Sequence, residues 1–75
     1  MNYIIIETQT ADGVTAVVTP VVKDNFYDAE QEFHSKLSFA AVSSVPIHAV
    51  TMITERGNVV KHECYVHTVE EDNAE

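Results

Sequence analysis

Helical periodicity occurs once in this chain, and it lies between two segments that alternate like β-strands. Apolar or small residues recur at about 100° per residue along one stripe, which consists of Phe26, Ala29, Phe33, Leu37, Ala40 and Ala41. Asn25 suits the N-cap of this helix, and a carboxylate at Asp28 completes a capping box. Pro46 disfavours helix at the residue before it, so the helix should end near residues 43–44.

The segment before the helix is predicted to form a β-hairpin. Residues 3–8 are β-branched, aromatic and apolar on both alternating faces, which is typical of a strand in the middle of a sheet. Asp12-Gly13 follows, and Asp-Gly between two apolar runs is a strong hairpin signal because Gly accepts positive φ. The returning strand spans residues 14–22. Pro20 cannot donate a ladder hydrogen bond, so this strand should lie at an edge or end early.

The segment after the helix is predicted to form a second hairpin, with strands at 48–54 and 59–69 joined by a turn at 55–58. The expected fold class is therefore α+β, a four-stranded antiparallel sheet in the order ββαββ with one helix packed on one face. Residues 1–69 should make a single domain. Residues 70–75 are an acidic segment with nothing to bury, which favours a disordered tail.

One helix can cover only one face of such a sheet, yet several strands carry apolar residues on both faces. Tyr3 and Ile5 alternate with Ile4 and Ile6, for example. We expect a second copy of the chain or another protein to close the uncovered face, which favours a homodimer or small oligomer. The alternative is that these are ordinary scattered apolar residues on a half-apolar surface.

Charge and length narrow the class of protein further. The net charge of the 75 residues is −8, and four of the twelve acids lie in the last six residues. Direct nucleic-acid binding needs a face rich in Lys and Arg, so it is not expected. No apolar run is long enough to cross a membrane, and the short apolar stretch at residues 3–6 is not expected to act as a signal peptide. A lone cysteine, Cys64, rules out an internal disulfide and fits a reducing compartment, so the expected location is the cytoplasm of whatever cell makes the protein.

Four histidines and one cysteine are the residues best suited to bind a metal ion or to take part in catalysis. His62 and Cys64 should share a strand face, and His48 on the neighbouring strand could approach them, which raises the possibility of a zinc site. The chain has no paired ligand motif, so half-buried side chains with ordinary hydrogen-bond partners are the alternative. Cys64 lacks the third orienting group of a catalytic triad, and no phosphate-binding loop is present. We therefore expect no enzymatic activity and no resident cofactor, with zinc as the exception to test.

Several short stretches together resemble a group of small uncharacterised proteins encoded by phages and prophages of gut Firmicutes. These stretches are residues 3–8, 11–13, 40–43, 48–50, 57–59 and 65–67. The resemblance spans most of the chain and rests on turns and on small residues at the helix end. It implies a setting in which small acidic proteins inhibit host defence, as anti-CRISPR proteins do, or serve as accessory parts of the virion.

This setting suggests a non-enzymatic protein that acts by surface recognition. The acidic side of the helix is the expected docking surface for a protein partner, whose identity the sequence does not give. It comprises Asp28, Glu32, Ser35, Phe39 and Val42. A basic channel on a defence complex would attract such a surface through complementary fields. The two alternatives are a structural or assembly component of the virion and a small metal-binding protein that uses His48, His62 and Cys64.

Overall fold

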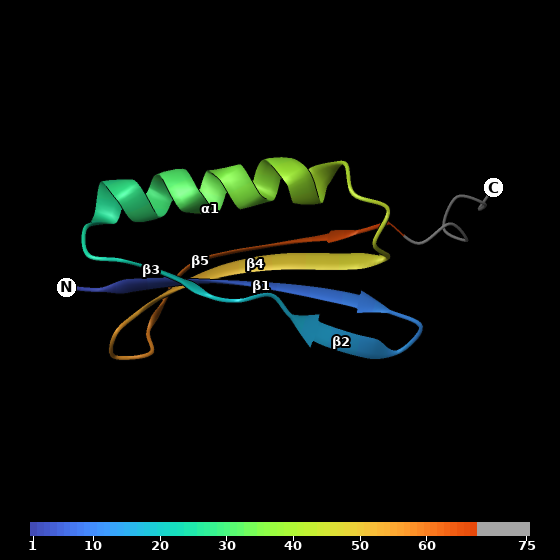
Figure 1. The fold of residues 1–75 in the computed structure, drawn as a ribbon, viewed down its shortest axis with the longest axis horizontal. Helices are drawn as coiled ribbons and strands as arrows, with labels where there is room; N and C mark the ends of the chain where they lie inside the picture. The colour runs from blue at the N-terminus through green and yellow to red at the C-terminus, as the bar shows by residue number, and fades with distance from the viewer. Residues whose placement is uncertain (68–75) are drawn as a thin grey trace.

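The computed structural model describes residues 1–67, which form an antiparallel sheet with one helix across one of its faces (Figure 1). The elements are β1 (Tyr3–Ala11), β2 (Val14–Val17), β3 (Val21–Lys23), α1 (Phe26–Ala41), β4 (Ile47–Thr54) and β5 (Val59–Val66). The α+β class and the single covering helix are confirmed. The predicted tail at 70–75 lies outside the described residues. No helix among the described residues has the length and apolar character needed to span a membrane.

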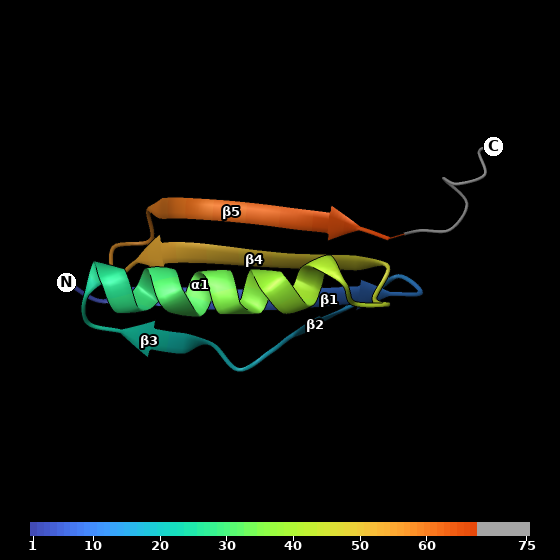
Figure 2. The ribbon, with the colours of Figure 1, turned by 90° about the horizontal axis from the view of Figure 1, so that it is seen from above.

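The sheet has five strands, where four were predicted. Its order is β2-β1-β4-β5, and β3 also pairs with β1, on the same side as β2 (Figure 2). The predicted strand at 14–22 is thus two strands with a break between them, and both lie at an edge. Pro20 falls in this break, where a residue without an N–H costs no ladder hydrogen bond. β1 pairs on both sides, as its two apolar faces predict.

Local signals set the first turn and the helix start. Asp12 and Gly13 both have positive φ, 55° and 78°, and form the two-residue turn between β1 and β2. The Asn25 side chain accepts a hydrogen bond from the backbone N–H of Asp28 (2.9 Å) and donates to its carboxylate (2.8 Å). The N-cap and the capping interaction at Asp28 are therefore confirmed.

The helix ends at Ala41, about two residues before the predicted end. Val42 and Ser43 still donate to carbonyls three residues back, at 3.3 Å each, so the last turn tightens and stops. The core stripe is confirmed for Ala40 but not for Ala41, which is exposed. The chain then crosses to Ile47, where β4 begins.

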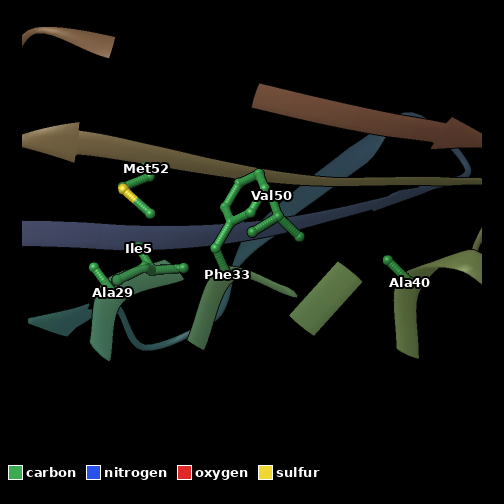
Figure 3. Close-up of a cluster of buried hydrophobic side chains, with 6 residues drawn as sticks. All are labelled: Ile5, Ala29, Phe33, Ala40, Val50 and Met52. Carbon is green, nitrogen blue, oxygen red and sulfur yellow. The ribbon is translucent and has the colours of Figure 1, made fainter. Parts of the chain in front are cut away.

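The hydrophobic core lies between α1 and the two central strands (Figure 3). Its fully or almost fully buried members are Ile5, Ala29, Phe33, Ala40, Val50 and Met52. They are Ile5 of β1, the alternating residues Val50 and Met52 of β4, and one stripe of α1. All of the core therefore lies on one side of the sheet.

No described helix or strand lies over the opposite side of the sheet, which we call the open face (Figure 1). The strand registers place the following residues on it: Ile4, Ile6, Thr8, Thr10, Thr15, Val17, Val22, Ile47, Ala49, Thr51, Ile53, Val59, His62, Cys64 and Val66. None of them is Asp, Glu, Lys or Arg. The open face is thus a broad, uncharged surface of a strongly acidic chain.

Candidate functional site

The outer side of α1 carries the surface that the sequence marks for partner binding. Asp28, Glu32, Ser35, Phe39 and Val42 follow one another at three- to four-residue steps, so they form one stripe along the helix. We call them the helix stripe. Phe39 and Val42 expose 70% and 82% of their surfaces, which leaves a large aromatic and a β-branched residue in solvent. The structure therefore places all five predicted residues on one exposed side of the fold, with the two apolar ones at its C-terminal end.

A hollow of about 400 Å³ lies at the other end of the helix stripe. It is lined by Lys23, Asp28, Gln31, Glu32 and Ser35. Lys23 comes from β3, so the hollow follows the seam between that strand and the helix. The sequence reasoning missed Lys23 and Gln31, because neither belongs to an apolar pattern. The hollow is polar and of mixed charge, which suits a polar side chain of a partner better than an apolar one.

The proposed metal ligands do not converge. His48 lies on the helix side of the sheet and is almost fully buried, whereas His62 and Cys64 lie on the open face. A β-bulge near Met52 is the reason, because one extra residue in β5 reverses which side chains share a face with β4. Within residues 1–67, no group of three His, Cys, Asp or Glu side chains is arranged to hold a metal ion. The prediction of a site built from these three residues is therefore wrong.

Each of the other histidines has a separate protein partner. His34 lies 3.2 Å from Glu30 one turn back on the helix. The ring of His62 bonds to the Thr51 hydroxyl across the open face, at 2.9 Å. His67 stands 2.9 Å from the carbonyl oxygen of Ala40, where its ring N–H supplies a donor to the end of the helix. The abundance of histidine thus has a structural explanation at three different places.

His48 belongs to a buried polar network that connects the sheet to the end of the helix. Its Nε2 lies 2.5 Å from a Glu7 carboxylate oxygen, and its Nδ1 lies 2.9 Å from the Ser43 hydroxyl. Gln9 donates to the same carboxylate at 3.1 Å, and the Lys36 ammonium lies 3.5 Å from its other oxygen. Every polar atom of Glu7 thus has a partner, as burial of a carboxylate requires.

This environment shifts the pKa of Glu7. Burial alone would raise it, but the hydrogen bonds from His48 and Gln9 and the charges of His48 and Lys36 outweigh burial and hold the pKa below its ordinary value. The carboxylate is therefore ionised over a wide pH range. It acts as the fixed negative centre around which the network is arranged.

The order Ser43–His48–Glu7 is the connectivity of a hydrolase triad, but its setting is structural. Ser43 also accepts a hydrogen bond from the backbone N–H of Val45 at 3.3 Å, so its hydroxyl oxygen is held within the loop after α1. The hollow described above is lined by other residues, and His48 is only 3% exposed. The network therefore fastens the helix end to the central strands.

The sequence reasoning missed this network, although one signal pointed to it. Glu7 follows Ile4, Ile5 and Ile6 and has the same parity as Ile5. A carboxylate on the core-facing side of a central strand needs a buried partner, because an unpaired buried charge is strongly unfavourable. His48 is the partner that the neighbouring strand supplies through the register of Gln9 with His48.

Comparison of the chain with protein-family models, with curated proteins and with solved structures yields no match. The arguments for function therefore rest on the surfaces and contacts of this chain.

Proposed function

We propose that this chain is a non-enzymatic binding protein of phage origin that inhibits a bacterial defence complex, and that it docks through the helix stripe. The observation that supports this proposal best is the exposure of Phe39 and Val42, at 70% and 82%, on the same stripe as Asp28 and Glu32. Aromatic residues with flanking polar groups are typical anchors of protein interfaces. Such a stripe offers one apolar anchor and an acidic border.

The negative net charge of the chain favours a target with a basic surface. The chain has a net charge of −8, and two of its carboxylates, Asp28 and Glu32, lie on the helix stripe itself. A defence complex that binds nucleic acid has a positively charged channel, which would attract an acidic protein and raise the rate of association. Lys36 bridges Glu7 and Glu32 at 3.5 and 3.6 Å, so Glu32 is held in place along the stripe. The docking surface is thus partly preorganised.

The test is a plasmid-interference assay in bacteria that carry defence systems, with the chain expressed in trans. The variant Phe39→Ser with Val42→Ser should abolish inhibition, because it removes the apolar anchor and leaves the capping interaction at Asp28 intact. The matched control is Val14→Thr with Val59→Thr, which alters two apolar residues of similar exposure, 69% and 64%, away from the helix. The control should inhibit as the parent chain does.

Charge reversal gives a second variant of the same surface. Asp28→Lys with Glu32→Lys should also abolish inhibition, while circular dichroism checks that the helix persists despite the loss of the capping carboxylate. Unchanged inhibition in both stripe variants would discard this docking surface. A parent chain that inhibits no defence system would discard the inhibitor function itself.

A virion component is the second candidate, and the open face favours it. An uncovered sheet face that is uncharged on every strand suits permanent burial in an assembly more than transient recognition. Purified virions should then contain the chain in fixed stoichiometry with other structural proteins. Its absence from virions would rule this candidate out.

A further inference from the structure

We infer that a second copy of this chain covers the open face, so that two sheets pack face to face with the helices outside. The inference concerns a different surface from the helix stripe, and it holds whichever function the stripe serves. Three features of the open face argue for a second copy as the occupant: its lack of charge, its paired polar groups and its size.

The lack of charge is the first argument. The chain carries −8, so two copies repel each other wherever acidic surfaces meet. The carboxylates of β1 and β5 that the structure describes, Glu7 and Glu63, lie on the helix side, together with Lys61. The open face therefore lets two acidic chains meet without placing carboxylates opposite each other. It offers a charged partner no complementary group.

The second argument is that four polar side chains on the open face are already paired with one another. Thr51 and His62 form a hydrogen bond of 2.9 Å between β4 and β5, and Thr10 and Thr15 form one of 2.8 Å between β1 and β2. A polar group that keeps its partner can be buried at little cost, whereas an unpaired one is expensive to bury. A second copy can therefore cover these four side chains without having to supply polar partners for the atoms that they already pair.

Size is the third argument. Four strands about 4.8 Å apart and about eight residues long at about 3.4 Å per residue present on the order of 500 Å² of sheet. Two copies would then bury on the order of 1,000 Å², the lower bound for a specific protein interface. Packed sheets with aligned strands stack about 10 Å apart, with their side chains filling the space between them.

The architecture of the monomer agrees with this arrangement. All six core residues lie between the helix and one side of the sheet, so a single copy has half of the interior that a three-layer domain has. Small domains commonly gain the missing burial by association. Ile4 and Ile53 are register partners on the open face and, together with Ile6, would supply apolar side chains to the second interior at the end of the sheet where β1 begins.

The test compares Ala49→Lys with Ala41→Lys by sedimentation equilibrium. Ala49 is at the centre of the open face, whereas Ala41 is exposed at the end of α1, so the two variants add the same charge at different places. The parent chain and Ala41→Lys should have twice the chain mass of 8.3 kDa, and Ala49→Lys should have the single mass. A monomeric parent chain at 100 µM, or a dimeric Ala49→Lys, would overturn the inference.

Cys64 provides a readout that needs no substitution. It is the only cysteine, it is exposed in the single chain and it lies on the open face. Alkylation by iodoacetamide should slow about tenfold once nine tenths of the chains are dimeric, by mass action. An alkylation rate constant that is the same at 1 µM and at 200 µM chain would refute coverage of this face, even if Ala49→Lys failed to fold.

Discussion

Ile5 and Ile6 are neighbours on β1 whose side chains leave the sheet on opposite sides, so the same substitution at both positions measures what the helix contributes. Ile5 is fully buried beneath α1, whereas Ile6 is partly exposed on the open face. Ile5→Ala removes three carbon groups, a transfer loss of about 2.4 kcal/mol at about 0.8 kcal/mol each. The cavity left beneath the helix adds about 1 kcal/mol, so the expected loss of stability is about 3–4 kcal/mol.

Ile6→Ala should cost much less in the isolated chain. Only the flanking strands contact Ile6, and water fills the space left by its side chain, so we expect a loss of about 1 kcal/mol. Urea unfolding followed by far-ultraviolet circular dichroism measures both variants, at a protein concentration at which sedimentation shows the chain to be monomeric. A domain of this size has a total stability of about 4–11 kcal/mol, so Ile5→Ala leaves a small margin.

Ile5→Val is the milder version of the same experiment, with an expected loss of about 1 kcal/mol against almost none for Ile6→Val. Equal losses at the two positions would refute the reasoning, because they would mean that the open face is as well covered within one chain as the helix side. A larger loss for Ile6→Ala only at high protein concentration would instead agree with a covering second copy.

Two further predictions concern the polar contacts of the fold. The Glu7 carboxylate has a lowered pKa, so its stabilisation is fully present above the ordinary value of 4.5 and is lost as the pH falls through the lowered value. Glu7→Gln should therefore lose less unfolding free energy than the parent chain between pH 6 and pH 3, as measured by urea unfolding. The same slope of unfolding free energy against pH in both proteins would contradict the network. Asn25→Ala should lower stability by about 1 kcal/mol in thermal melts while Asn25→Asp keeps most of it, because only a side-chain acceptor caps the helix. Equal melting temperatures for the two Asn25 variants would contradict the cap.

Much of the fold was predictable because its signals are local. The Asp12-Gly13 turn and the Asn25 cap each depend on a few adjacent residues, and both appear as expected. The core stripe of α1 was correct from Phe26 to Ala40, since helical periodicity needs no knowledge of the sheet. Pro20 was recognised as a problem for its strand, but whether it would end the strand or divide it in two depends on pairing with β1.

The candidate site was less predictable because strand register is not a local property. Alternation along β5 correctly put His62 and Cys64 on the same face. Whether His48 joins them depends on how β5 is aligned with β4, and a shift of one residue moves every side chain to the other face. Near the turn, Ile53 pairs with Val59. If that register continued along both strands, His48 and His62 would lie on the same side of the sheet. The bulge changes that register.

The same bulge accounts for the uncharged open face. Met52 pairs with Lys61 while the next residue of β4, Ile53, pairs with Val59, so Val60 is the extra residue. Beyond it, Lys61 faces the helix, where its ammonium lies 2.6 Å from Glu30 and 5.8 Å above the ring centre of Phe33. In the register without the bulge, Lys61 and Glu63 would lie on the open face. One inserted residue therefore separates the histidines, joins β5 to the helix through an ion pair, and leaves a neutral surface that a second acidic chain can cover.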